Sequence, residues 1–373
     1  MKIAIINGFD TYEHRVDLIY KYFSRSGDHV SVFTSNFQHI EKKKRIQKKE
    51  NFTYVETVEY KRNLSIARIF SHIKLSKDIF SFLENDYDLL WVLVPPNSLV
   101  KNAIKYKRKN KKVKLVFDLI DLWPETMPIG KVKESFPFIL WKNIRNKNIN
   151  SADYIVTECK LFQNYLPKKI DSSKISTLYL SYGNEIIERN FNMLNLSGQE
   201  ISLCYLGSMN NIIDNNVIKN IILSLSKNYH VKFHIIGDGE KKSELLQLLT
   251  LIANLEIIDH GKIYDNKLKN EILSSCHFGL NIMKKDVLVG LTMKSLDYFK
   301  NGIPIINNIE GDTWEFVENC GVGINTKDGF VSSEILHNYL ENFANIQKFY
   351  QQNFSEDTFN VEFSKVLKEI MVF

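Results

Sequence analysis

The segment LVGLTMKSLDYFKNGIPIIN, from Leu288 to Asn307, has the pattern of a loop, a helix, a Gly-x-Pro turn and a short apolar strand. Gly290 permits close backbone approach just before the helix, where free N–H groups and the positive end of the helix dipole favour an anion. Gly302 ends the helix, and Pro304 opens the buried strand. The segment therefore predicts a phosphate-binding helix start that leads into a core strand.

Two faces of this helix have different expected roles. Lys294 and Asp297 are three residues apart and share one face, whereas an adjacent face that can pack inward holds Met293, Leu296 and Phe299. One face would bind a ligand while the other packs. The alternative is an ordinary surface helix with a Lys294–Asp297 ion pair, which would stabilise it by only about 0.2 to 0.5 kcal/mol.

Length and composition favour two domains. The chain has 373 residues, of which 44% are hydrophobic, enough for two cores. No apolar run approaches the roughly 20 residues that a membrane span requires, and MKIAIINGFD begins a strand and a Gly turn, not a signal peptide. The four cysteines are far apart, which favours reduced thiols over disulfides or a zinc site. We expect a cytoplasmic protein with no metal ion and no resident cofactor.

The charges are unevenly distributed along the chain. Residues 1–180 contain 32 Lys and Arg against 19 Asp and Glu, a net charge of +13, and the remaining residues carry 17 against 24, a net charge of −7. This asymmetry predicts that the N-terminal half faces a phospholipid surface or a nucleic acid. A nucleic-acid partner is disfavoured, because the basic runs lack interleaved aromatic residues and no reader motif is present. A single run such as KKKRIQKK, Lys42 to Lys49, is also typical of a solvated surface.

Apolar strands alternate with helical stretches through both halves, which is typical of βαβ units around a parallel sheet. The first half has expected strands at 2–7, 29–34, 53–58, 88–95, 114–120 and 153–158, and helices at 13–24, 64–83 and 98–109. The second half has expected strands at 201–207, 231–237, 255–261, 277–283 and 303–307, and residues 332–373 are expected to be helical. Residues 183–200 have neither pattern and mark a linker. The predicted fold class is α/β, with two Rossmann-like domains.

Glycine turns follow the expected strands of the second half. They contain Gly207, Gly237, Gly239 and Gly261, and a further loop ends at Gly290. Parallel sheets bind ligands at the edge where such turns gather. One glycine turn is weak evidence, but turns at four successive strand ends, followed by Lys-x-x-Asp and Gly-x-Pro, predict a site for a nucleotide diphosphate.

Several motifs occur in a fixed order along nearly the whole chain. They are GDHV (27–30), DLWPET (121–126), YGN (182–184), LGS (206–208), IGDG (236–239), GKI (261–263), KSLDY (294–298) and GIP (302–304). In content and order they resemble the motifs of family 4 glycosyltransferases. Members of that group are retaining, nucleotide-sugar-dependent enzymes with the GT-B fold, used in bacterial capsule, exopolysaccharide and lipopolysaccharide assembly.

The resemblance implies two Rossmann-like domains whose parallel sheets face a central cleft. Residues 1–185 would bind the acceptor, residues 186–350 would bind the nucleotide sugar, and residues 351–373 would form a helix that returns to the first domain. The implied reaction moves a sugar from a nucleotide-diphosphate sugar, with a UDP-sugar favoured, to a glycan with retention of anomeric configuration. The nucleotide sugar is a co-substrate, so the resemblance implies no resident cofactor.

The resemblance also implies roles for single residues of the donor site. Lys294, with the amides near Gly290, Leu291 and Thr292, would stabilise charge on the departing diphosphate. Asp297, at the family's glutamate position, would accept hydrogen bonds from ribose hydroxyls. Further implied donor-binding residues are Gly207, Ser208, Gly237 and Gly239, Lys262 and Ile263 beside the base, and Asp286 in place of a glutamate that is absent at Val289.

On the acceptor side, Asp121 is an implied catalytic residue, and Gly8, His14 and Arg15 would line the acceptor site. His14 also fits a solvent-facing helix position, and Trp123 also fits a core position. No separate general base is demanded. In the front-face mechanism generally attributed to the family, the departing phosphate takes the acceptor proton, unlike in two-carboxylate glycoside hydrolysis.

The chain departs from the family pattern in ways that leave alternatives open. Relatives often carry an Arg and a Lys after the first strand of the second domain, but here Ser208 is followed by Met209, Asn210 and Asn211. The diphosphate clamp would then depend more heavily on Lys294. One alternative is a non-catalytic partner of a transferase. Another is a nucleotide-sugar 2-epimerase, which would show catalytic carboxylates and histidines in the cleft.

The segment FPFILWKNIR, residues 136–145, combines apolar bulk with flanking lysines. It fits docking at a membrane surface, where each basic residue contributes about 1 kcal/mol near anionic lipid, and it equally fits a buried helix with basic flanks. Together with the basic first half, it favours a polyprenyl-diphosphate-linked glycan as acceptor and peripheral contact with the inner face of the plasma membrane.

Overall fold

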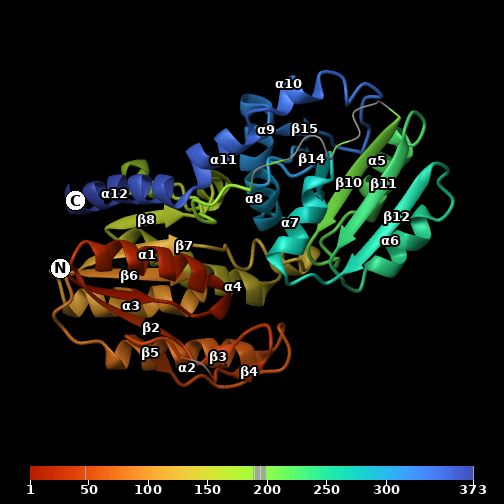
Figure 1. The fold of residues 1–373 in the computed structure, drawn as a ribbon. Coiled ribbons are helices and arrows are strands. Elements are labelled where there is room, and N and C mark those ends of the chain that lie inside the picture. The colour runs from red at the N-terminus through yellow and green to blue at the C-terminus, as the bar shows by residue number, and fades with distance from the viewer. Residues whose placement is uncertain (47, 188, 190–193, 195–198, 373) are drawn as a thin grey trace. The chain divides into compact units, whose positions relative to one another are not determined.

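The computed structural model describes residues 1–46, 48–187, 189, 194 and 199–372. The chain divides into two compact units: unit 1 is residues 1–181 with 359–373, and unit 2 is residues 182–358. Each unit is built around one parallel sheet (Figure 1). The predicted linker at 183–200 includes residues 188, 190–193 and 195–198, which lie outside the described residues. That linker and the boundaries at 185/186 and 350/351 stay predictions.

Seven parallel strands form the sheet of unit 1, in the order β5-β2-β1-β6-β7-β8-β9. Their bounds are β1 Lys2–Ile6, β2 His29–Ser35, β5 Phe52–Val55, β6 Leu89–Val94, β7 Lys114–Leu119, β8 Tyr154–Thr157 and β9 Ile175–Thr177. All six residues of β6 are buried, because helices cover both faces at the centre of a parallel sheet and an unbroken apolar run packs on both sides.

The helices of unit 1 form two layers. Strands β5, β6 and β7 are followed by α2 (Ile66–Phe82), α3 (Asn97–Lys109) and α4 (Phe136–Asn146), and right-handed crossovers place these helices on one face of the sheet. Helix α3 packs between α2 and α4. On the other face, α1 (Glu13–Arg25) connects β1 to β2 in the opposite direction.

The C-terminal helix α12 (Glu356–Val372) joins the α1 layer (Figure 1). The Phe363 ring lies 4.8 Å from the Tyr22 ring of α1 and 5.0 Å from Trp91 of β6, measured between ring centroids. The predicted return of the C-terminal helix to the first domain is therefore confirmed.

Six parallel strands form the sheet of unit 2, in the order β12-β11-β10-β13-β14-β15. Their bounds are β10 Glu200–Leu206, β11 His230–Ile236, β12 Leu255–Gly261, β13 Phe278–Asn281, β14 Ile305–Asn307 and β15 Gly323–Asn325. The helices are α5 Asn215–Leu225, α6 Lys242–Leu249, α7 Asn266–Ser274, α8 Met293–Lys300, α9 Asp312–Cys320, α10 Tyr339–Phe343 and α11 Ile346–Phe354. The direction of strand succession reverses between β10 and β13, the switch point at which open α/β sheets bind ligands.

Some sequence-based expectations are wrong in detail. Met293 is 41% exposed and does not pack inward. Residues 332–373 are not helical throughout, because α10 begins only after Asn338 in the left-handed region, and the extended Ser355 separates α11 from α12. The strands β3 (Phe37–Gln38), β4 (Lys43–Lys44), β9 and β15 were not predicted, since two or three residues show no period. Within the described residues, no helix has the length and apolar content of a membrane span.

Candidate donor and acceptor sites

An asparagine ladder runs across the carboxyl edge of the unit 2 sheet. Asn281, Asn307 and Asn325 end β13, β14 and β15 and pair in register. Asn281 Nδ2 donates to Asn307 Oδ1, and Asn307 Nδ2 donates to Asn325 Oδ1, both at 2.8 Å. Thr292 Oγ1 donates to Asn281 Oδ1 at 2.7 Å. The ladder thus satisfies buried amides and fixes the residue that precedes α8.

The loop before α8 is held at each of its last positions. The Gly290 carbonyl accepts hydrogen bonds from Thr313 N at 2.8 Å and Thr313 Oγ1 at 2.6 Å. Leu291 is half-buried, and Thr292 is the N-cap of α8, where its Oγ1 accepts from Ser295 N. The predicted residues therefore form an ordered helix start at the ligand edge, which favours an anion.

Tyr298 ties α8 to β10 at the switch point. Its hydroxyl donates to Cys204 O at 3.1 Å and accepts from Leu206 N at 2.9 Å. Its ring covers Gly279, where a Cβ would lie 2.5 Å from the ring. Sequence reasoning gave Tyr298 no role, although a glycine inside an expected strand was a signal of close approach.

Lys294 lies in the first turn of α8 with its Nζ 4.3 Å from the centre of the Tyr205 ring. The Nζ is buried and makes no hydrogen bond to any described residue. Burial lowers the pKa of Lys294 to about 7. An anion close to this nitrogen would stabilise the protonated form of Lys294 and raise its pKa again. The site is therefore suited to bind an anion.

Asp297 does not pair with Lys294. Its Oδ1 accepts a hydrogen bond from Lys269 Nζ of α7 at 2.8 Å, and both side chains are 18% exposed. The alternative of an ordinary Lys294–Asp297 ion pair is therefore wrong. The ribose-binding role of Asp297 stays a prediction.

The glycine turns of unit 2 pack against one another. A Cβ at Gly237 would lie 2.0 Å from Gly207 O, and one at Gly239 would lie 2.2 Å from Met209 O. All three glycines have positive φ, and Gly207 has open space where its Cβ would be. Gly237 and Gly239 are thus required by loop packing, whereas Gly207 leaves its backbone open to a ligand.

The remaining donor-side residues lie at the same edge and are more exposed. Ser208 is exposed, and its carbonyl accepts from the hydroxyl of Tyr205, the residue whose ring covers Lys294. Lys262 is 59% exposed, with its Nζ 3.6 Å from an Asp238 oxygen. Ile263 is half-buried, and Asp286 is exposed in the turn after β13. Their donor contacts stay predictions.

In unit 1 the switch point lies between β1 and β6. Gly8 follows β1 and packs against the loop after β6, where a Cβ would lie 2.3 Å from Pro96 Cδ. His14 is exposed, and its Nε2 lies 2.5 Å from the carbonyl oxygen of Ser181. Both predicted acceptor residues therefore lie at the carboxyl edge of this sheet.

Arg15 is a core residue of unit 1. Its Nε and Nη2 donate to the two oxygens of Asp118 at 2.7 and 2.8 Å, and its Nη1 donates to Leu178 O at 2.8 Å. Asp118 also accepts from Trp91 Nε1 at 2.9 Å, and Arg15 is 1% exposed. These contacts give Arg15 a structural role, and its acceptor contact stays a prediction.

Two carboxyl groups follow neighbouring strands at this edge. Asp121 Oδ2 accepts from Trp123 Nε1 at 2.7 Å, and burial raises the pKa of Asp121. Glu158 follows β8, its backbone N–H bonded to Leu119 O of β7, and burial raises its pKa to about 8. Sequence reasoning missed Glu158. The pair offers one carboxyl that can donate a hydrogen bond and one that can accept, suited to sugar hydroxyls.

A buried cationic and aromatic cluster packs on Trp123, the residue that donates a hydrogen bond to Asp121, and sequence reasoning missed it. The Arg68 guanidinium lies 4.5 Å from the centre of the Trp123 ring, and the His72 ring stacks on the same indole at 6.1 Å. Arg68 and His72 are each 4% exposed, and burial lowers the pKa of His72 well below its usual value. Trp123 is therefore a core residue, as the alternative interpretation predicted, and its indole N–H positions Asp121.

The described residues include no group of three or more His, Cys, Asp or Glu that could hold a metal ion. The two sheet edges offer an N-terminal helix turn, a buried amine and backbone donors in unit 2, and two carboxyl groups in unit 1.

The sequence matches no protein-family profile and no curated relative. Solved structures do match over the full length. The lipopolysaccharide outer core galactosyltransferase WaaB in its apo form has a TM-score of 0.67 and 15% identity, covering 98% of this chain and 99% of that chain. The fold is GT-B.

Two further structures agree. HepE from Anabaena in complex with UDP has a TM-score of 0.66 and 12% identity, over 99% of this chain and 100% of that chain. Sucrose-phosphate synthase from Thermosynechococcus elongatus has a TM-score of 0.65 and 10% identity, over 100% and 99%. These likenesses confirm the predicted fold class.

Proposed function

We propose that the protein is a retaining glycosyltransferase of the family 4 type. It would move a sugar from a UDP-sugar to a lipid-linked glycan in bacterial surface polysaccharide synthesis. The observation that carries the proposal is the buried Nζ of Lys294, beside the N-terminus of α8 at the switch point of the sheet. Among the described residues it has no hydrogen-bond partner. The fold shared with a lipopolysaccharide galactosyltransferase and with a UDP complex supports the donor class and the pathway class.

In this proposal the diphosphate lies against the first turn of α8 and the open backbone at Gly207. Negative charge grows on the departing phosphate as the bond between the sugar and the diphosphate breaks. Lys294, which takes a proton from solvent when the anionic donor binds, stabilises that charge. In unit 1, Asp121 and Glu158 would hold hydroxyl groups of the acceptor glycan. The attacking hydroxyl would give its proton to the departing phosphate, as the front-face mechanism requires. No base from unit 2 is required, and the sugar keeps its anomeric configuration.

The test is a panel of UDP-, GDP- and dTDP-sugars, with thermal stabilisation and nucleotide release as readouts and Lys294→Ala alongside wild type. We expect stabilisation and release with a UDP-sugar, both lost in Lys294→Ala while its circular dichroism is unchanged. Equal turnover in the variant would contradict the clamp. No response to any donor would instead favour a non-catalytic partner, and an inverted product anomer by NMR would exclude retention.

A further inference from the structure

One face of unit 1 carries an exposed apolar surface on two helices. On α2, exposed apolar side chains follow a helical stripe: Ile66 86%, Ile69 43%, Phe70 58% and Ile73 38%. On α4 they are Phe136 72%, Ile139 45% and Leu140 49%. Both helices lie in the same layer, with α3 between them. Apolar area gathered in this way on one face marks a binding surface.

The rest of that face is strongly basic. Helix α3 presents Lys101, Lys105 and Arg108 outward between the two apolar helices. These side chains form no ion pair with an acidic residue in the part of the chain that the structure describes. An apolar surface interleaved with uncompensated positive charge is complementary to the boundary of an anionic bilayer, where acyl chains meet phosphate groups.

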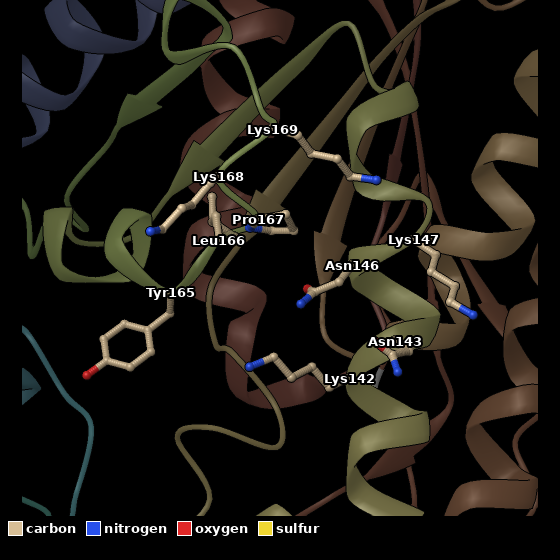
Figure 2. A pocket seen from close by; sticks show the side chains of 9 residues that line it. All are labelled: Lys142, Asn143, Asn146, Lys147, Tyr165, Leu166, Pro167, Lys168 and Lys169. Carbon is tan, nitrogen blue, oxygen red and sulfur yellow. The ribbon is translucent and has the colours of Figure 1, made fainter.

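A basic hollow opens beside α4 in the same unit. It has a volume of about 440 Å³, and Lys142 and Asn146 point into it from α4 toward the segment 165–169 (Figure 2). Its lining includes Lys147, Lys168 and Lys169, none of which pairs with an acidic side chain among the described residues. The hollow therefore holds positive charge that the protein does not neutralise.

Helix α4, which lines one side of this hollow, is held in place by contacts on its buried face. Arg145 of α4 is fully buried, and its guanidinium donates to Glu125 Oε1 at 2.6 Å and to Trp123 O at 3.2 Å. Lys142 shares Glu125 at 3.0 Å, so Glu125 is already matched by two cations. Residues Phe138 and Trp141 pack inward against the cluster around Phe9 and Trp123. Helix α4 is therefore a fixed surface helix, and the alternative of a buried helix is wrong.

We propose that the outer face of α2, α3 and α4 docks on an anionic phospholipid membrane, with one headgroup phosphate in the lysine hollow. Phe70, Phe136 and their neighbours would enter the headgroup and acyl boundary, while the α3 cations and the hollow bind lipid phosphates. The inference does not depend on transferase activity, because the face is complete within unit 1. It would bring the carboxyl edge of that unit to the surface on which a lipid-linked acceptor resides.

The test is co-sedimentation of the full chain with vesicles of phosphatidylcholine containing phosphatidylglycerol, and with pure phosphatidylcholine vesicles. The charge variant is Lys147→Gln/Lys168→Gln/Lys169→Gln. Its matched control is Lys21→Gln/Lys365→Gln/Lys368→Gln, exposed lysines on α1 and α12, which lie on the opposite face of the sheet. Each lysine near an anionic surface raises partitioning about fivefold, so the charge variant should lose about a hundredfold and the control only a few-fold.

The apolar variant is Phe70→Ser/Phe136→Ser, with Val361→Ser/Met371→Ser on α12 as control, where the native side chains are 55% and 45% exposed. We expect the apolar variant to lose at least about tenfold in vesicle binding and its control to bind as wild type. Equal binding to pure phosphatidylcholine, or wild-type binding by both test variants, would overturn the proposal.

Free glycerol phosphate or an oligonucleotide are the competing occupants of the hollow. In the absence of vesicles, either ligand would bind to wild type and to the apolar variant with equal affinity. Either would bind more weakly to the charge variant. Such binding, together with no partition into anionic vesicles, would also overturn the membrane assignment. Donor release by the charge variant without vesicles should match wild type, which separates this inference from the transferase proposal.

Discussion

Replacing Lys294 by methionine removes the buried amino group and keeps a side chain of similar length over the Tyr205 ring. In wild type the Nζ is buried without a hydrogen-bond partner among the described residues. Such a group opposes folding, since the unfolded chain solvates its charge fully. We therefore expect Lys294→Met to be more stable than wild type without donor, and to lose the stabilisation that donor provides.

The magnitude follows from the pKa, which burial lowers from 10.5 to about 7. One pKa unit corresponds to about 1.4 kcal/mol, so the buried lysine costs up to about 4 kcal/mol at pH 7.5. The cation–π contact with the Tyr205 ring stabilises the charged form of Lys294 by about 1 to 2 kcal/mol, which reduces this cost. The expected gain in Lys294→Met is therefore about 2 to 3 kcal/mol at pH 7.5.

The pH dependence has a definite sign. Between pH 7 and 10.5 the unfolded lysine holds its proton while the folded one releases it, so wild-type stability rises with pH in this window. The gain in Lys294→Met should accordingly fall to about 1 kcal/mol at pH 9.5. Below pH 7 both states are protonated, and the full cost applies.

The assay is urea unfolding of both proteins at the two pH values, repeated with saturating UDP-sugar. Lys227→Met, at an exposed position of unit 2, is the matched control and should change the unfolding midpoint little at either pH. A loss of stability in Lys294→Met, or a gain that is equal at both pH values, would refute a buried neutral amine. Donor stabilisation that survives in the variant would refute the phosphate clamp.

Three further predictions concern the frame around the sites. Asn307→Ala should destabilise unit 2 by about 2 to 3 kcal/mol and weaken donor binding, because Asn281 Nδ2 and Asn325 Oδ1 both lose their partner in the ladder; urea unfolding and donor titration measure these effects. Arg15→Met should lower the free energy of unfolding by about 3 to 5 kcal/mol, because it leaves the buried Asp118 carboxylate without its cation. Arg15→Met/Asp118→Leu should recover most of that stability in the same assay. Glu158 keeps its proton up to about pH 8 in the folded protein and only up to about pH 4.5 in the unfolded chain. Stability should therefore fall as pH rises through this window. In Glu158→Gln, the midpoint of urea unfolding should fall less over the same pH range.

The strands could be predicted because each is a short apolar run bounded by turn residues, a signal that lies within one segment. The partners of single polar residues could not. Asp297 has a lysine three residues before it and another, Lys269, on the preceding helix, and helical spacing cannot choose between them. Arg15 has the same limitation, since its partner Asp118 is 103 residues away in the sequence.

The asparagine ladder shows the same limit more clearly. Asn281, Asn307 and Asn325 each resemble an ordinary turn residue at a strand end, and only the register of β13, β14 and β15 brings them together. In contrast, the sequence predicted that α4 has apolar bulk with basic flanks, but not whether its apolar side chains point inward or outward. Its composition fitted a buried helix or a docking helix. The exposure of Phe136, Ile139 and Leu140 shows that α4 lies at the surface, while Arg145 marks its buried face.

The glycine turns and Lys294 contribute differently to the case for a donor site. Gly237 and Gly239 are explained by the close packing of neighbouring loops, so those turns would be required in this fold even without a ligand. Lys294 has no such explanation, because its amino group lowers stability and its contact with the Tyr205 ring compensates that cost only in part. Proteins retain destabilising polar groups mainly where function uses them. A cost of a few kcal/mol placed at the switch point, where an anion would relieve it, is therefore stronger evidence for a diphosphate site than the glycine motifs.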